Sequence, residues 1–69
     1  MPEYSIAVDI GGTFTDVVLR HRDSRFWVDK TLTTPENLDQ CFFAVIDAVL
    51  RRAGCRPDQV DDVIVHATT

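Results

Sequence analysis

The segment of residues 9–16, with the sequence DIGGTFTD, constrains the fold of this chain more than any other. It lies between two short apolar runs, IAV at residues 6–8 and VVL at residues 17–19. Short β-branched runs separated by paired glycines are typical of a β-hairpin with a tight turn. Gly11 and Gly12 can take positive φ without steric cost, and they leave the backbone open to a ligand. The sequence therefore predicts a hairpin with an accessible turn.

The polar residues of this hairpin suit a phosphate group. Successive N–H groups in such a turn can converge on an anion, and Thr13 and Thr15 add hydroxyl donors. A carboxylate beside a phosphate is repulsive unless a cation lies between them, so Asp9 is a candidate Mg²⁺ ligand, directly or through water. We interpret the hairpin, which Asp16 closes on the other side, as a phosphate-binding element for a nucleotide. A turn capped by Asp and Thr without any ligand is the alternative.

Three segments carry a resemblance to a known family. VDIGGTFTDVVL, KTLTTP and VIVHATT, at residues 8–19, 30–35 and 63–69, resemble the amino-terminal region of the hydantoinase A and 5-oxoprolinase family. The family consists of large ATP-dependent enzymes, and its relatives include subunits of acetone and acetophenone carboxylases. It is similar to the wider superfamily of sugar kinases, heat-shock chaperones and actin, in which a comparable hairpin holds ATP phosphates. DIGGT alone would also fit a sugar kinase, but TFTD and KTLTTP favour the hydantoinase group.

The resemblance implies ATP and Mg²⁺ as cofactors and a cyclic amide or a ketone as substrate. The implied activity is ATP-driven opening of a cyclic amide such as 5-oxoproline or a hydantoin, or phosphorylation that precedes carboxylation of a ketone. Asp9 is the candidate catalytic and metal-binding residue. The candidate phosphate-binding residues are Gly11, Gly12, Thr13, Phe14, Thr15, Asp16, Thr68 and Thr69. The last two follow a strand end, where open α/β sheets bind ligands, but Ala67 stands before them where the family commonly has glycine.

The order of predicted elements is βββαβ. Strands are expected at residues 4–10, 14–20, 25–33 and 63–65, and a helix at residues 35–53. The return from helix to last strand favours a parallel, right-handed crossover. We therefore expect an α/β fold with a mixed sheet and one main helix on one face. This order matches the ribonuclease H-like half-domain of actin-like ATPases that the resemblance implies.

The third predicted strand alternates, with residues 26, 28, 30 and 32 on one side and residues 27, 29 and 31 on the other. One of its faces should be half-buried, near an edge of the sheet. Strict alternation puts Lys30 beside Phe26 and Val28, so it either snorkels or lies where the strand twists out of the core. The family has a lysine shortly before its TP step, which suggests a phosphate contact. An edge-strand lysine that discourages aggregation is the favoured interpretation.

The predicted helix has clear end signals. Thr34 is the expected N-cap with Pro35 at the first helical position, and Gly54 is the expected C-terminal stop. Apolar residues recur at helical spacing and predict the buried stripe, at Leu38, Cys41 or Phe42, Val45, Ile46, Val49, Leu50 and Ala53. Phe43 falls outside this stripe. It faces either a surface that is missing from this chain or solvent.

Composition excludes several classes of function. Seven basic and eleven acidic residues give a net charge of −4, with no basic stripe for nucleic acid or an anionic membrane surface. No run approaches the roughly 20 apolar residues of a membrane span, so we expect a cytoplasmic protein. Cys41 and Cys55 lack zinc-ligand spacing and an activating neighbour, so neither is assigned as a nucleophile. His66 is a candidate proton carrier, although a structural role is favoured.

The 69 residues are expected to form a single partial domain. In the family, ATP lies between two lobes, and the second lobe is missing from this sequence. We therefore expect the chain to need the remainder of a parent enzyme, or a complementary subunit, and to be inactive alone; whether it is itself an enzyme stays open. The alternative is a free-standing structural or interaction module that keeps the fold without nucleotide chemistry.

Overall fold

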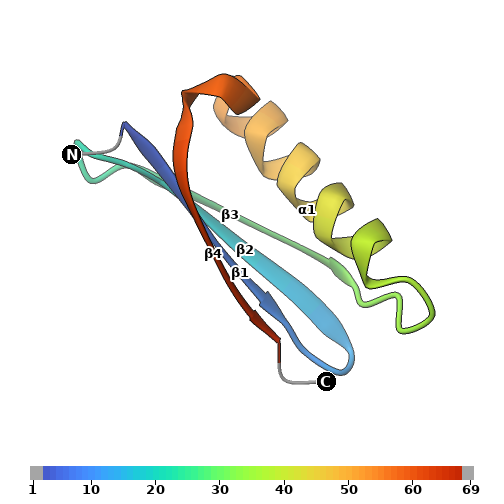
Figure 1. Ribbon diagram of the computed structural model, residues 1–69. Coiled ribbons are helices and arrows are strands. Elements are labelled where there is room, and N and C mark those ends of the chain that lie inside the picture. The colour runs from blue at the N-terminus through green and yellow to red at the C-terminus, as the bar shows by residue number, and fades with distance from the viewer. Residues whose placement is uncertain (1–2, 68–69) are drawn as a thin grey trace.

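The computed structural model describes residues 3–67. Its four strands form one sheet in the order β3-β2-β1-β4. Neighbouring strands are antiparallel except for β4, which runs parallel to β1. The elements are β1 (Tyr4–Ile10), β2 (Phe14–His21), β3 (Phe26–Leu32), the helix α1 (Leu38–Ala53), the short 3-10 helix η1 (Pro57–Gln59) and β4 (Val60–Ala67) (Figure 1). This confirms the predicted mixed sheet with one main helix and a parallel return.

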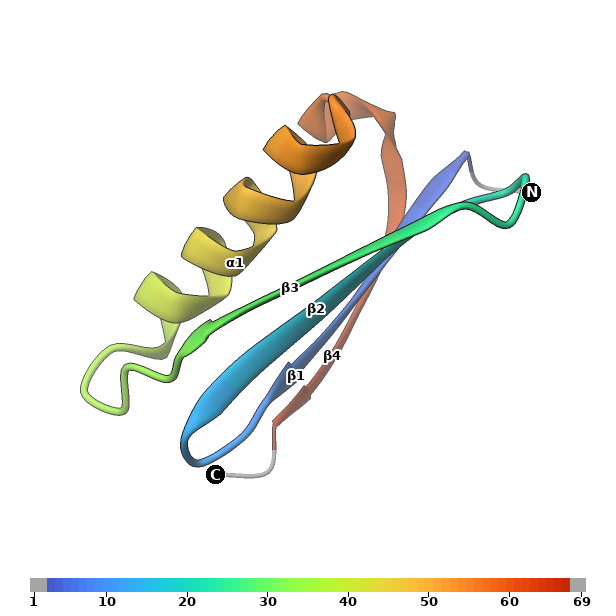
Figure 2. The same ribbon diagram turned by 180° about the vertical axis from the view of Figure 1, so that it is seen from behind.

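A single helix covers one face of the sheet. α1 lies over β2 and β3, and both views show it on the same side of the sheet, while no element of residues 3–67 covers the opposite side (Figures 1 and 2). Leu19 and Val49 are fully buried between these layers. The core consists of Ile6, Val8, Ile10, Val17, Leu19, Val45, Val49, Leu50 and Cys55. Burial of this apolar surface is the main favourable contribution to folding.

Strand β4 lies beyond the reach of the helix. Residues 61–67 are all exposed, although the strand pairs with β1 along its whole length. Its apolar centre has side chains on both faces: Val63 and Val65 are each 48 % exposed on the helix side, and Ile64 is 63 % exposed on the other. β4 is also longer than the predicted strand, since it begins directly after η1.

The face of β3 that meets the helix is the one that carries Trp27 and Asp29. The register pairs Trp27 with Leu19, whose side chain is fully buried, whereas Phe26 and Val28 are 64 % and 49 % exposed on the other face. The expectation that the face with Phe26, Val28 and Lys30 is the core side is therefore wrong. Lys30 does share their face, but that face is uncovered, so the lysine neither snorkels nor twists away.

The helix begins later than predicted. Its N-cap is Asn37, which makes no side-chain capping bond, and α1 starts at Leu38 rather than at Pro35. Asn37 has a non-helical backbone, with φ of −153° and ψ of 89°, so Pro35 and Glu36 form a separate turn before the helix. The Thr34 hydroxyl instead donates to the Asn37 carbonyl at 2.6 Å and accepts from the Cys41 N–H at 3.1 Å. This hydroxyl therefore lies between the Asn37 carbonyl and the Cys41 N–H and forms a hydrogen bond with each.

The C-terminal end of the helix follows the prediction. Gly54 takes a left-handed conformation with φ of 67°. The Gly54 N–H donates to the Arg51 carbonyl at 3.3 Å, and the Cys55 N–H donates to the Leu50 carbonyl at 3.0 Å. These bonds satisfy carbonyls that the last helical turn leaves open.

Within residues 3–67 the helices are too short or too polar to span a lipid bilayer.

The connection between β2 and β3 holds a carboxylate with a shifted pKa. The Arg25 backbone N–H donates to Asp23 Oδ1 at 3.0 Å, and His21 Nδ1 lies 2.8 Å from the same oxygen. These hydrogen bonds, with the Arg25 side chain 2.7 Å from Oδ2, lower the pKa of Asp23 from its ordinary 3.8 to about 2. The turn is therefore stabilised by the ionised form of Asp23.

We expect this stabilisation to be lost in acid. Because the folded pKa lies below the unfolded one, the contribution is complete above about pH 4 and disappears as pH falls towards about 2. Asp23→Asn should therefore flatten the fall in free energy of unfolding between pH 4 and 2, measured by urea denaturation at each pH. Asp58→Asn, an exposed carboxylate paired with the Arg56 side chain, is the control. Equal slopes in all three proteins would contradict this assignment.

Candidate functional site

Four ionisable side chains form one row across the uncovered face of the sheet. The strand register pairs Lys30 with Asp16, Asp16 with Asp9, and Asp9 with His66, so each strand contributes one member. We call these four residues the charged row. It lies beside the β1–β2 turn, at the carboxyl ends of the parallel strands β1 and β4, which is where open α/β sheets place their ligands.

The two ends of the charged row are cationic or titratable, and its centre is acidic. His66 Nδ1 is 3.4 Å from Asp9 Oδ1, and Lys30 Nζ is 3.9 Å from Asp16 Oδ1. All four side chains are more than half exposed. Asp9 and Asp16 stand directly opposite each other, and like charges at such positions repel. This repulsion is relieved by a cation, so the centre of the row suits a positively charged ligand or an ion.

A shallow hollow of about 290 Å³ opens over this part of the sheet. Asp9, Asp16 and His66 provide its polar lining, and its apolar lining consists of Ala7, Val8, Val18 and Ile64. Among residues 3–67, no group of three or more His, Cys, Asp or Glu side chains is arranged to hold a metal ion. An ion at Asp9 would therefore need further oxygen ligands from water or from a phosphate.

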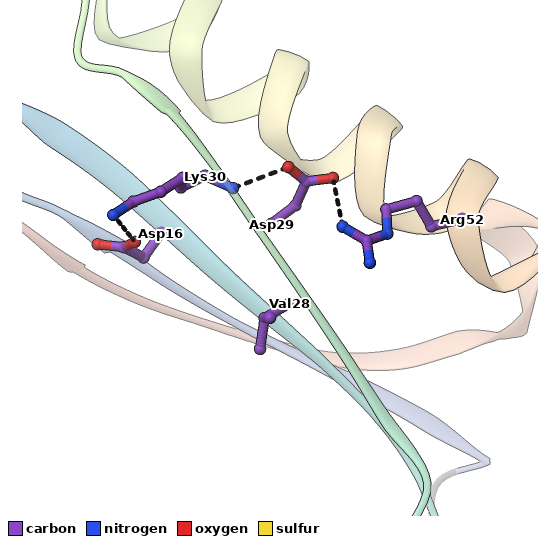
Figure 3. A pocket seen from close by; sticks show the side chains of 5 residues that line it. All are labelled: Asp16, Val28, Asp29, Lys30 and Arg52. Atoms are coloured by element: carbon purple, nitrogen blue, oxygen red, sulfur yellow. Dashed lines mark hydrogen bonds and ion pairs between the residues drawn. The ribbon is translucent and has the colours of Figure 1, made fainter.

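A second hollow, of about 380 Å³, lies at the outer edge of β3 (Figure 3). Figure 3 shows Lys30 reaching towards Asp16 while Asp29 turns towards Arg52 on α1, at an Oδ2–Nη1 distance of 3.8 Å. The Lys30 ammonium also lies 4.6 Å from the centre of the Phe14 ring. These contacts are compatible with the edge-strand interpretation of Lys30, and its phosphate contact stays a prediction.

The glycine turn is open, but its conformation differs from the expected one. Neither Gly11 nor Gly12 has positive φ; within the described part of the chain only Ser24 and Gly54 do. The connection is longer than a two-residue turn, and the Gly11 N–H closes it by donating to the Phe14 carbonyl at 3.0 Å. A Cβ added at Gly11 would lie 3.0 Å from that carbonyl oxygen, whereas one at Gly12 would meet no atom within 4 Å.

Thr15 points away from the charged row and towards the helix. It is fully buried, and its hydroxyl lies 2.9 Å from the Thr33 hydroxyl and 3.4 Å from Cys41 Sγ. Thr33 in turn donates from its hydroxyl to the Gly11 carbonyl and from its N–H to the Thr13 carbonyl, both at 2.8 Å. We call Thr15, Thr33 and Cys41 the hydroxyl–thiol cluster. It ties the glycine turn to the start of α1.

The remaining candidates are distributed around the turn. Thr13 is exposed in the turn itself. Phe14 is 43 % exposed and lies on the same face as Asp16, beneath Lys30. Thr68 and Thr69 lie outside the described residues. Sequence reasoning did not single out Thr33, although the Thr-Thr-Pro step that follows β3 marks it as a residue at the junction with the helix.

A comparison with known families identifies the group to which the chain belongs. Residues 5–69 match the family model described as the hydantoinase/oxoprolinase N-terminal region. The chain belongs to this family. The match begins at the second residue of β1, runs through β4 and includes the whole charged row, the glycine turn and the hydroxyl–thiol cluster. It confirms the resemblance carried by residues 8–19, 30–35 and 63–69. A comparison with curated proteins gave no match.

We expect the hydroxyl–thiol cluster to contribute to stability as a unit. Thr33→Val should lower the free energy of unfolding by about 1–3 kcal/mol, because it leaves the buried Thr15 hydroxyl and the Gly11 carbonyl without this partner. The Thr15→Val/Thr33→Val double variant should cost less than the sum of the single variants. Thr31→Val, on the same face of β3 but partly exposed, is the control and should change stability by less than about 0.5 kcal/mol. Additive losses would show that the two hydroxyls act independently.

The two glycines should respond differently to alanine. Gly11→Ala brings Cβ against the Phe14 carbonyl and should destabilise the hairpin by about 1–3 kcal/mol. Gly12→Ala meets open space and should leave the melting temperature nearly unchanged. Thermal denaturation of the two variants side by side measures this contrast. A larger loss for Gly12→Ala would mean that the turn has another conformation in solution.

Proposed function

We propose that this chain is the ATP-phosphate-binding N-terminal part of an ATP-dependent enzyme of the hydantoinase/oxoprolinase type. The single observation that carries the proposal is the pair of facing carboxylates, Asp9 and Asp16, beside an open glycine turn at the carboxyl ends of β1 and β4. Facing carboxylates call for a cation, and an open turn admits a phosphate close to the backbone. Mg²⁺ with ATP satisfies both requirements.

The residues of the site fit this group in distinct roles. Asp9 would hold Mg²⁺ directly or through water, with Asp16 as a second, outer carboxylate. Gly12 would let the phosphates approach, because nothing lies within 4 Å of where its Cβ would be, and Thr13 would add an exposed hydroxyl donor. Phe14 would pack at the end of the turn, where its ring contacts the Lys30 ammonium. Thr15 would act through the buried cluster, by fixing the shape of the turn rather than by touching the ligand.

The family membership supports the class of reaction. ATP would supply a phosphoryl group that turns the oxygen of an amide carbonyl or an enolate into a better leaving group. The chain's own contribution to such a transfer is positioning and neutralisation of charge. A cyclic amide is the substrate we favour, and a ketone that is subsequently carboxylated is the other member of the class. The remainder of the enzyme, or a complementary subunit, would supply the second lobe and the substrate pocket.

The topology supports the finer assignment of the fold. Three antiparallel strands, a crossover helix and a fourth strand parallel to the first give the order β3-β2-β1-β4. We propose that this is the ribonuclease H-like half-domain of the actin-like ATPases. In that arrangement the β1–β2 turn is the phosphate loop, which agrees with the position of the charged row.

A free-standing interaction module is the second candidate. The observation in its favour is apolar exposure: Phe43 is 63 % exposed on the outer side of α1, against the edge of Phe42, and Phe26 and Leu32 are 64 % and 63 % exposed on the uncovered face. Such groups of exposed apolar side chains commonly mark partner surfaces. This candidate predicts no response to nucleotide.

The deciding measurement is thermal denaturation of the chain with and without Mg·ATP. A ligand that binds only the folded state adds RT ln(1 + [L]/Kd), about 1.4 kcal/mol at ten times Kd. We expect a rise in melting temperature that needs both Mg²⁺ and ATP. Asp9→Asn should abolish this rise and yet raise the melting temperature of the ligand-free protein slightly, because it removes the repulsion with Asp16.

Asp47→Asn, on the outer face of α1 and paired with Arg51, is the matched control and should keep the full response. Gly12→Ala should weaken the response without unfolding the protein. An unchanged response in Asp9→Asn, or a rise that persists when Mg²⁺ is chelated, would refute the assignment of the site. No response in the wild-type chain would favour the interaction module.

A further inference from the structure

The glycine turn and the start of α1 lie at the same end of the molecule (Figures 1 and 2). Residues 33–37 connect β3 to α1 at this end, and they begin with two neighbouring threonines. Thr33 bonds to the turn: its hydroxyl donates to the Gly11 carbonyl and its N–H to the Thr13 carbonyl, both at 2.8 Å. Because Thr33 is only 9 % exposed, little water is available to replace these bonds. A shift of the turn therefore displaces Thr33 or breaks a shielded hydrogen bond.

The next residue, Thr34, bonds to the helix. In a regular helix each N–H donates to the carbonyl four residues before it, so the first such bond of α1 would join the Cys41 N–H to the Asn37 carbonyl. The Thr34 hydroxyl bonds to both of these groups. Asn37 itself makes no side-chain capping bond. The order of the first helical turn thus depends on the position of Thr34.

A buried contact links the turn and the helix a second time. The Thr15 hydroxyl lies 2.9 Å from the Thr33 hydroxyl and 3.4 Å from Cys41 Sγ. Since the Thr33 proton is donated to the Gly11 carbonyl, the single hydroxyl proton of Thr15 serves two acceptors, one tied to the turn and one on the helix. A displacement of either acceptor therefore changes the hydrogen bond to the other.

We propose that the Thr33–Thr34 step couples the glycine turn to the first turn of α1. When the glycine turn holds its conformation, Thr33 keeps its neighbour Thr34 in place at the helix start, and when the helix start frays, the glycine turn loosens. The element with two states is the first turn of α1, ordered or frayed, because helix ends open locally at low cost in free energy. Thr34 is in this way a positioning residue for the glycine turn, although its own hydroxyl bonds lie at the helix.

The coupling extends to a ligand that binds the turn. An anion that binds the ordered turn better than the loosened one shifts the helix start towards its ordered state, and the effect is reciprocal. This extension rests on the proposed phosphate binding, whereas the coupling between turn and helix is a property of the ligand-free chain. The two are therefore measured separately.

Amide hydrogen exchange of the ligand-free chain, followed by NMR, tests the coupling. Thr34→Ala removes the hydroxyl at the helix start and should speed the exchange of the Cys41 N–H. The decisive signal is the Gly11 N–H, which lies in the turn and donates to the Phe14 carbonyl. We expect its exchange to become faster by about threefold or more, because fraying of the helix start loosens the turn.

Two controls separate the coupling from a general loss of stability. Thr34→Ser keeps the hydroxyl and should leave the Cys41 and Gly11 amides close to their wild-type rates. The His21 N–H, which donates to the Arg25 carbonyl at the opposite end of β2, is the internal reference. Its exchange rate should be unchanged in Thr34→Ala.

The reverse experiment starts from the turn. Thr33→Val removes the bond to the Gly11 carbonyl and should speed the exchange of the Cys41 N–H by about threefold or more. Thr33→Ser keeps the hydroxyl and should restore the slower rate. If circular dichroism shows that Thr33→Val does not fold, Thr34→Ala decides the matter, because Thr34 is only partly buried.

Titration with Mg·ATP tests the extension to the ligand. In the wild-type chain the nucleotide should slow the exchange of the Cys41 N–H. In Thr34→Ala the Kd for Mg·ATP should rise by about threefold to tenfold, with Thr34→Ser close to the wild type. A wild-type chain that binds no Mg·ATP refutes the proposed function, and the exchange rates of the ligand-free chain then decide the coupling alone.

The coupling is overturned by a Thr34→Ala variant in which only the amides of the helix start exchange faster and the Gly11 N–H keeps its wild-type rate. Equal acceleration of the His21 N–H also overturns it, because the loss of stability would then be global. An unchanged Kd for Mg·ATP in Thr34→Ala, with binding in the wild type, overturns the extension to the ligand.

Discussion

The contact between α1 and the β2–β3 half of the sheet is the interaction on which the rest of the structure depends. Val45 and Val49 of the helix meet a surface that contains Val17 and Leu19, and all four are at most 1 % exposed. A single helix of this length spans only part of a four-stranded sheet. The uncovered face and the bare strand β4 follow directly from that limit, because no second layer is present within residues 3–67 to bury them.

The same one-sided packing explains where polar chemistry is located. Side chains on the helix face must be apolar or hydrogen-bonded, and the buried Thr15 and Thr33 satisfy this condition by bonding to each other. On the uncovered face no such restriction applies, so Asp9 and Asp16 can face each other without desolvation. Repulsion between them is then a local strain that a cation relieves, which links the architecture to the proposed ligand.

Much of this architecture was predictable from local sequence, because short apolar runs, alternation with period two and a glycine stop are local signals. The strands and the end of α1 at Gly54 follow from such signals, and the DIGGTFTD motif together with the KTLTTP and VIVHATT segments correctly indicated the family. The face of β3 was not predictable, since Phe26 and Trp27 are equally apolar and only pairing with Leu19 decides between them. The helix start at Leu38 was not predictable either, because the Thr34 hydroxyl takes the hydrogen bonds of the Asn37 carbonyl and the Cys41 N–H. The charged row was not predictable, because its four residues are brought into line by the register of three strand pairs. Lys30 and His66 were each candidates on their own, without their partners.

Thr33 has one further consequence, which concerns the direction of a donor. It draws the Gly11 carbonyl inward through its hydroxyl. In a trans peptide unit the C=O and the following N–H point in opposite directions, so the Gly12 N–H is directed away from Thr33. A buried threonine thereby orients an amide at the rim of the sheet before any anion arrives. Preorganisation of this kind reduces the conformational entropy that a ligand must offset on binding, and it comes from a residue that the ligand need never touch.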